Sequence, residues 1–260
     1  MQQRPLSRTG RTVSAVGLGT WQLGADWGDV SEDDARAVLS ASADAGVTLF
    51  DTADVYGDGR SEEIIGKFLK SRDADGITVA TKMGRREDQV PENYVMENFR
   101  GWLDRSRRLL DTETLDLVQL HCPPSAVIDD DATWDALDRL VSEGVIAAYG
   151  VSVETMDQAL SALRRPHLTN LQIIFNPFRL KPLDEVLPLA SEKNVAVFAR
   201  VPLASGLLSG KYTRSTTFDE NDHRTYNRNG EAFDKGETFS GVPFDEGVAA
   251  ADELKASLPE

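Results

Sequence analysis

Cysteine and histidine are scarce in this 260-residue chain, and their scarcity limits its chemistry. Cys122 is the one cysteine, so no internal disulfide can form. A single thiol cannot build a zinc site, and the three histidines lie far apart without metal-ligand spacing. They are His121, His167 and His223. We therefore expect no metal site and a reducing compartment, with the cytoplasm as the default location.

Long apolar runs and an excess of basic residues are also missing. No stretch approaches the roughly 18 apolar residues of a membrane span, and residues 1–10 lack the apolar core of a signal peptide. The 43 acidic residues outnumber the 28 lysines and arginines, which gives a net charge of −15. Because this charge repels phosphate backbones and anionic lipids, we expect neither nucleic acid nor membrane as a partner.

The residues that are present fit one globular domain over residues 1–260. With 40% hydrophobic and 27% charged residues, the composition excludes disorder, collagen and a small disulfide scaffold. Seven short apolar runs with little alternation predict parallel strands that are buried on both faces. These runs are residues 15–19, 47–50, 77–80, 115–120, 145–151, 171–175 and 195–199.

Stretches with helical spacing separate these runs, so the chain reads as repeated βα units. This repetition favours a (β/α)8-type TIM barrel, an α/β fold, over an open dinucleotide-binding sheet. The glycines at Gly17, Gly19 and Gly24 do not fit the fingerprint that such an open sheet would carry.

Three further segments have distinct patterns. Residues 6–13, with a turn at residues 8–11, predict an N-terminal hairpin that could close one end of the barrel. Residues 211–243 lose the apolar periodicity, so we expect a mobile, partly disordered loop there. A last helix is predicted from about residue 245 to 258.

Polar residues follow the predicted strands where a barrel carries its active site. They are Asp51, Lys82 and His121, with Tyr56 in the loop after Asp51. A lysine ammonium beside a phenol favours the phenolate and lowers its pKa, which is ordinarily about 10. Asp51 would orient Lys82, and a neutral His121 could direct a carbonyl oxygen toward the proton donor. Together these residues predict a site that protonates an oxygen while another group delivers hydride to carbon.

Seven segments of the chain resemble the aldo-keto reductase family. They are GLGTWQLG (residues 17–24), DTADVYGDGRSEEIIGKFL (51–69), VATKMG (79–84), LDLVQLHCP (115–123), YGVS (149–152), LQIIFN (171–176) and PLASGLLSGK (202–211). The resemblance implies reduction of an aldehyde or ketone to an alcohol by hydride from a nicotinamide cofactor, NADPH (NADP) rather than NADH. It implies Tyr56 as the general acid, Lys82 and Asp51 as its tuning pair, and His121 as the group that orients the carbonyl.

The resemblance also implies the cofactor contacts. Ser152 and Gln172 would hold the carboxamide of the nicotinamide, and the loop at residues 202–208 would cover the pyrophosphate with backbone N–H groups. The full set is Thr20, Trp21, Asp51, Ser152, Gln172, Arg200, Val201, Pro202, Leu203, Ser205, Gly206, Leu208 and Gly210. Trp21 fits equally well as a substrate-pocket aromatic or as a side chain that closes the barrel mouth, and Trp27 is a weaker candidate.

The chain departs from the family pattern at three places. Val153 replaces an asparagine after Ser152, and Arg200 with Val201 replaces an aromatic that stacks on the nicotinamide. A planar guanidinium can also stack on a ring. The family's eighth strand and its helix would begin after about residue 260, so we expect a barrel incomplete at its C-terminus, with exposed strand edges and weak binding of NADPH.

Two alternatives keep the barrel but change the function. Lys82 could act as a Schiff-base nucleophile in an aldolase-type lyase, since a desolvated barrel lysine can serve that role. The chain could also be a non-catalytic or weakly active cofactor-binding or regulatory barrel. The sequence indicates neither the physiological carbonyl or alcohol substrate nor an oligomeric state.

Overall fold

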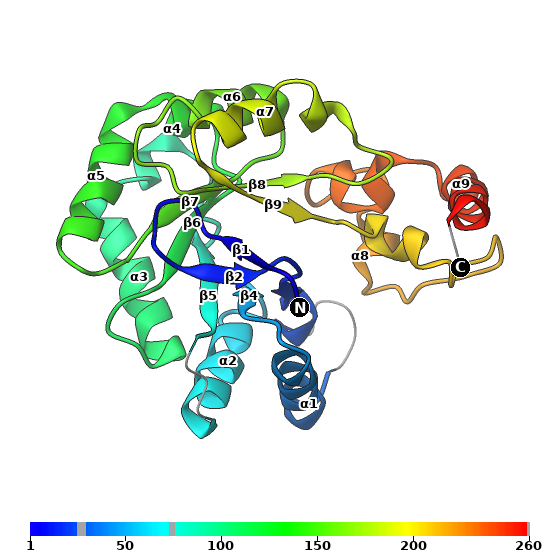
Figure 1. Ribbon diagram of the computed structural model, residues 1–260, viewed down its shortest axis with the longest axis horizontal. Coiled ribbons are helices and arrows are strands. Elements are labelled where there is room, and N and C mark those ends of the chain that lie inside the picture. Colours follow the sequence, from blue (N-terminus) through cyan, green and yellow to red (C-terminus); the bar gives the residue numbers. More distant parts are fainter. Residues whose placement is uncertain (25–29, 73–75, 259–260) are drawn as a thin grey trace.

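A curled sheet of seven parallel strands forms the centre of the protein (Figure 1). The computed structural model describes residues 1–24, 30–72 and 76–258, so Trp27 lies outside the described residues. Each strand pairs with the next along the chain, and β3 and β9 are the outer strands of this sheet. In order they are β3 (Leu18–Gly19), β4 (Leu49–Asp51), β5 (Thr78–Met83), β6 (Leu117–His121), β7 (Tyr149–Ser152), β8 (Asn170–Ile174) and β9 (Ala196–Arg200). The predicted parallel strands and the incomplete barrel are confirmed.

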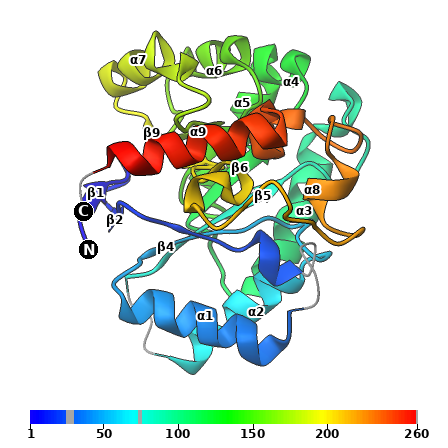
Figure 2. The ribbon, with the colours of Figure 1, turned by 90° about the vertical axis from the view of Figure 1, so that its right-hand side faces the viewer.

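Helices connect the strands and cover the outer face of the sheet (Figures 1 and 2). They are α1 (Glu32–Asp44), α2 (Arg60–Ser71), α3 (Met96–Leu110), α4 (Ser125–Asp129), α5 (Asp131–Ser142), α6 (Met156–Ala162) and α7 (Val186–Glu192). Shorter 3-10 turns are η1 (Trp21–Gly24), η2 (Pro91–Asn93) and η3 (Lys181–Leu183).

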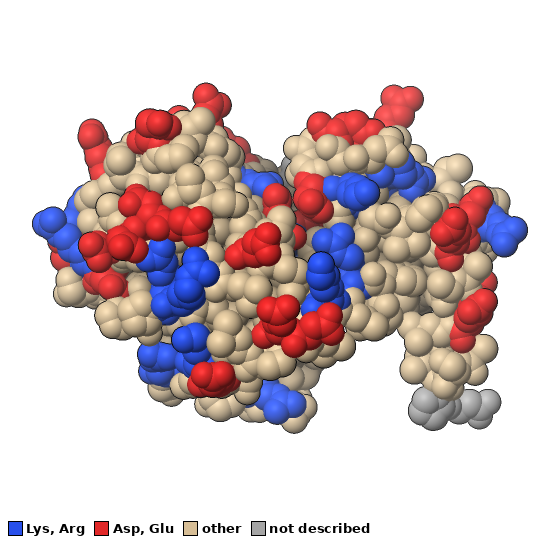
Figure 3. All heavy atoms as spheres, turned by 90° about the horizontal axis from the view of Figure 1, so that it is seen from above, with Lys and Arg blue, Asp and Glu red and all other residues tan. Residues whose placement is uncertain are grey.

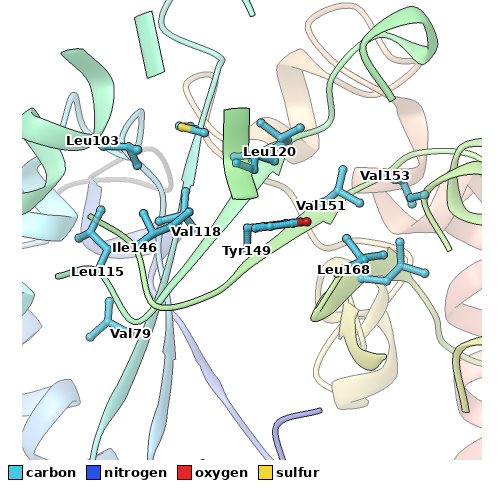
Figure 4. Packing of buried hydrophobic residues seen from close by; sticks show 14 of the residues in the cluster. Val79, Leu103, Leu115, Val118, Leu120, Ile146, Tyr149, Val151, Val153 and Leu168 are labelled. Atoms are coloured by element: carbon cyan, nitrogen blue, oxygen red, sulfur yellow. The ribbon is translucent and has the colours of Figure 1, made fainter. Parts of the chain in front are cut away.

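The main core lies between the sheet and these helices. Leu103 of α3 packs there with Val118 and Leu120 of β6 and Val151 of β7, all at most 1% exposed (Figure 4). The apolar residues of α3 recur at steps of three and four, and its charged residues fall on the other face. The helix is therefore amphipathic and buries one face against the sheet. The helix ends at Leu110, and the next residue, Asp111, takes a left-handed conformation (φ 53°).

The N-terminal hairpin is confirmed. Strands β1 (Gln3–Pro5) and β2 (Thr12–Ser14) pair antiparallel. Leu6 and Val13 are buried in a second cluster with Leu49 and Leu117, which begin β4 and β6. The hairpin therefore covers the N-terminal end of the half-barrel, opposite the end that carries the site residues.

The segment at residues 211–243 reaches the C-terminal end of β9, where Glu237 pairs with Arg200. It contains α8 (His223–Tyr226), η5 (Lys235–Glu237) and η6 (Phe239–Gly241). Phe239 is buried in a third cluster with Leu207 of η4 (Ala204–Ser209) and Val248 of α9 (Phe244–Ser257). Helix α9 confirms the predicted last helix, whereas the mobility expected for residues 211–243 stays a prediction. No helix within the described ranges is both long and apolar enough to cross a membrane.

Helices α2 and α3 approach closely at Gly66. A Cβ added at this residue would lie 2.4 Å from the carbonyl oxygen of Leu109 and 2.9 Å from the backbone of Leu110. Gly101 on α3 offers the opposite case, because nothing lies within 4 Å of a Cβ added there. An alanine at Gly66 therefore tests the close packing of the two helices, whereas an alanine at Gly101 tests helix propensity alone.

We predict that Gly66→Ala lowers the free energy of unfolding by about 2 kcal/mol, because backbone atoms must shift. Gly101→Ala should raise it by about 0.5–1 kcal/mol, since alanine is the better helix former. Urea unfolding of the three proteins measures both effects. Equal changes in the two variants would contradict the close approach of α2 and α3.

Two carboxyl groups are buried where the loop that follows β4 leads into α2. Asp54 and Glu62 are both 0% exposed, and neither oxygen of the Asp54 carboxyl has a hydrogen-bond partner among the described residues. Burial raises the pKa of Asp54 to about 7, with a further increase from the charge of Glu62, although Arg86 and Arg105 oppose both. Since the ordinary pKa is 3.8, the unfolded chain releases this proton first as the pH rises.

Stability should therefore fall between about pH 4 and pH 7 through Asp54, by an amount on the order of 4 kcal/mol. We predict that Asp54→Asn melts at a higher temperature than the wild type at pH 8 but at nearly the same temperature at pH 4.5. The exposed Asp58 in the same loop is the control, because Arg86 lowers its pKa and Asp58→Asn should not stabilise the protein at pH 8. A shift for Asp54→Asn that is equal at both pH values would contradict the buried charge.

Candidate active site

The register of three neighbouring strands brings His121, Ser152 and Gln172 into one row. Ser152 of β7 is paired with His121 of β6 on one side and with Gln172 of β8 on the other. His121 and Ser152 are the last residues of their strands, and Gln172 is the third residue of β8, so the row lies toward the strand ends where barrel active sites lie. Each is less than 9% exposed, and each lines one cavity.

Lys82 is the buried centre of the predicted catalytic group. Its side chain is 1% exposed, and its Nζ lies 2.8 Å from Oδ2 of Asp51 and donates to the carbonyl oxygen of Thr52 at 2.7 Å. The ammonium also lies 5.2 Å from the centre of the Tyr56 ring. One lysine thus pairs with the carboxylate and lies beside the tyrosine that the sequence placed near it.

Two glutamine amides complete the environment of Asp51. Oδ1 accepts hydrogen bonds from Nε2 of Gln119 at 3.2 Å and from Nε2 of Gln172 at 3.1 Å. Both carboxylate oxygens are therefore engaged, and Asp51 is held in one orientation against Lys82. Gln119 is a site residue that the sequence analysis missed, although a glutamine inside the apolar strand β6 was a usable signal.

The phenol of Tyr56 lies beside His121. Their ring centres are 6.0 Å apart, and the rings meet edge to face at 86°. Tyr56 is half-buried and also stacks near Trp21, with 6.0 Å between ring centres. The four predicted residues Asp51, Tyr56, Lys82 and His121 are therefore one contiguous group.

The pKa values of this group differ in one respect from the sequence expectation. Burial raises the pKa of Tyr56, and the charge and hydrogen bond of Lys82 lower it, but burial has the larger effect. For Lys82, burial lowers the pKa, yet Asp51 and Tyr56 together raise it above its ordinary value. The phenol thus keeps its proton at neutral pH, and the amine stays an ammonium.

Burial also lowers the pKa of His121 well below its ordinary value, and the charges of Arg85, Lys82 and Arg200 act in the same direction. His121 is therefore neutral at pH 7 and can donate only one hydrogen bond at a time from its ring. Its neutral state agrees with the sequence expectation.

A cavity of about 660 Å³ opens above these residues, a size typical of small-molecule sites. The space-filling view shows a hollow between the half-barrel and the part with α8 and α9 (Figure 3). The predicted residues that line the cavity are Thr20, Trp21, Asp51, Tyr56, His121, Ser152, Gln172, Arg200, Val201, Pro202, Leu203, Ser205 and Gly206. Lys82, Leu208 and Gly210 do not line it, and Lys82 lies behind Asp51 and Tyr56, which do.

Eight residues that line the cavity were not predicted, and four of them come from the segment at residues 211–243. Its Tyr212, Tyr226, Phe233 and Glu237 line the cavity together with Arg85 from the loop after β5. The ring of Phe233 lies 5.7 Å from that of Trp21, so Trp21 is part of an aromatic wall. The segment has no apolar periodicity, so the sequence held no signal that it would reach the site.

The donors and acceptors of the cavity fit a nicotinamide cofactor. Ser152 offers a hydroxyl 3.5 Å from Sγ of Cys122, and Gln172 donates to Asp51 while its carbonyl oxygen can still accept. A donor beside an acceptor is complementary to a carboxamide. At Gly206 a Cβ would lie 2.3 Å from the hydroxyl of Tyr212, and the left-handed Ser205 and Gly206 form a tight backbone curve.

The chain was compared with families and with individual proteins. Residues 15–257 match the model of the aldo/keto reductase family. The aldo-keto reductase YhdN of Bacillus subtilis is 31% identical over 230 residues, which are 87% of this chain and 69% of that protein. The aldo-keto reductase yakc of Schizosaccharomyces pombe, whose name specifies NADP(+), is 30% identical over 221 residues, which are 82% of this chain and 65% of that protein.

The fold agrees with solved structures as well. The glycerol dehydrogenase AKR11B4 from Gluconobacter oxydans has a TM-score of 0.75 and 33% identity, and the match covers 95% of this chain and 75% of that chain. Both the sequence motifs and the half-barrel with its strand-end residues are therefore those of one family. The chain belongs to the aldo/keto reductase family of nicotinamide-dependent oxidoreductases.

Proposed function

We propose that the protein reduces an aldehyde or ketone to an alcohol with NADPH, and that Tyr56 is the general acid. The observation that carries this proposal is the buried ammonium of Lys82, which pairs with Asp51 and lies 5.2 Å from the centre of the Tyr56 ring, beside a neutral His121. A proton donor (Tyr56), a charge that lowers the pKa of this donor (Lys82) and a second hydrogen-bond donor (His121) are thus grouped beside one cavity.

The chain's own residues handle the proton. Tyr56 donates it to the carbonyl oxygen, and Lys82 stabilises the phenolate that remains. Asp51 holds Lys82 in place, and the neutral His121 donates a hydrogen bond that points the carbonyl oxygen at Tyr56. When bound, the reduced nicotinamide supplies the hydride that the carbonyl carbon receives.

The cofactor contacts belong to the same proposal. Ser152 and Gln172 would hold the carboxamide, and the curve at Ser205 and Gly206 would face the pyrophosphate. The preference for NADPH over NADH is supported by the relative from Schizosaccharomyces pombe, whose name specifies NADP(+). The remaining predicted contacts of Leu208 and Gly210 stay predictions, as does the cytoplasmic location.

The two alternatives receive less support from the site. A Schiff-base nucleophile needs a neutral amine, but Asp51 and Tyr56 raise the pKa of Lys82 and keep it charged. A regulatory barrel without catalysis would not need the complete set of Asp51, Tyr56, Lys82 and His121. Catalytic reduction is therefore the function that the site supports best.

We predict that Tyr56→Phe lowers the turnover number by about 10²- to 10⁴-fold, because the variant lacks the proton donor. The loss of NADPH absorbance with a panel of small aldehydes and ketones measures turnover, and NADPH fluorescence measures binding. Binding should change little, since the phenyl ring keeps the shape of the cavity.

Tyr94→Phe is the matched control, because Tyr94 is a buried tyrosine that does not line the cavity. This variant should keep the turnover of the wild type. Unchanged turnover in Tyr56→Phe would remove Tyr56 from the mechanism.

A further inference from the structure

An ion pair lines the cavity. One of its members is on β9, which is four strands along the sheet from β5, the strand that carries Lys82. Arg200 at the end of β9 pairs with Glu237 of η5, and their side chains are only 12% and 18% exposed. Arg200 lies next to Ile174 on β8, two residues beyond Gln172. Both members of the pair line the same cavity as Tyr56 and His121.

The guanidinium of Arg200 is held by several elements at once. Its Nη2 donates to the carbonyl oxygen of Val153 at 2.9 Å and lies 3.8 Å from Sγ of Cys122, while Nη1 pairs with Glu237. Arginine stays charged at any physiological pH. The cavity therefore contains a fixed cation whose counter-charge comes from the segment at residues 211–243.

This cation lines the cavity that Tyr56 and His121 also line. Its charge acts on both Tyr56 and His121, the two residues that face the carbonyl oxygen in the proposed function. A hydride donor must approach the carbonyl carbon to about 3–3.5 Å. The nicotinamide ring must therefore lie within the electric field of the pair Arg200–Glu237.

We propose that Arg200 and Glu237 together set which oxidation state of the nicotinamide the site prefers. The inference rests on the proposed function, because it requires the ring to be in this cavity. The reduced ring is uncharged, whereas the oxidised ring carries one positive charge. Arg200 therefore disfavours the oxidised form, Glu237 favours it, and the two charges balance in the wild type.

Two charge-removing variants should move this balance in opposite directions. Arg200→Met leaves Glu237 as the uncompensated charge and should lower the ratio of the NADP⁺ dissociation constant to the NADPH dissociation constant by about threefold or more. Glu237→Gln leaves the cation uncompensated and should raise the same ratio by about threefold or more. Arg200→Lys keeps the charge, so its ratio should stay within about twofold of the wild type.

The experiment measures both dissociation constants for the wild type and each variant, with NADPH fluorescence for the reduced form and titration calorimetry for the oxidised form. The double variant Arg200→Met/Glu237→Gln removes both charges, and its ratio should return to near the wild-type value. This variant also keeps the test decisive if one single variant folds poorly, as judged by circular dichroism.

A purely structural pair, which only ties β9 to η5, would weaken both forms of the cofactor by the same factor. Equal changes in the two dissociation constants, or ratios that move in the same direction in both single variants, would overturn the proposal and leave the proposed function intact. If the wild type bound neither form at millimolar concentration, the proposed function and this inference would both fail.

Discussion

The site depends on one buried ammonium. Lys82 is 1% exposed, and a lone charge so far from water would be costly, so the fold must surround it with oxygen atoms. It does so with a carboxylate from Asp51 and a carbonyl from Thr52, and the ring centre of Tyr56 lies 5.2 Å from the ammonium. These three residues lie on β4 or in the loop that follows it, so the contacts of Lys82 hold the start of this loop beside β5.

The ion pair of Lys82 and Asp51 also fixes the side chains around it. Asp51 must point at Lys82, and the amides of Gln119 and Gln172 hold its second oxygen. The phenol is left between the ammonium and His121, facing the cavity. Arg200 and Glu237, which also line the cavity, balance each other separately, so the cavity presents paired charges rather than one dominant sign.

Much of this arrangement could be predicted from the sequence, because it follows from short-range patterns. The apolar runs marked the strands, and parallel strands bring the residues at their C-terminal ends together, so Asp51, Lys82 and His121 were predictable as neighbours. Glu237 and Phe233 were not, because residues 211–243 have no periodicity and fold through side-chain contacts. The net pKa of Tyr56 also depends on burial, which no motif reports.

The most direct test of the account follows the phenol of Tyr56 itself. Carbon-13 NMR of ring-labelled tyrosine, assigned with Tyr56→Phe, measures the pH at which this phenol loses its proton in the wild type and in Lys82→Met. The account predicts that the phenol of the wild type keeps its proton beyond the ordinary tyrosine pKa of about 10 and that removing Lys82 moves its titration to still higher pH. An unchanged or lower midpoint in Lys82→Met would contradict the coupling of the ammonium to the phenol.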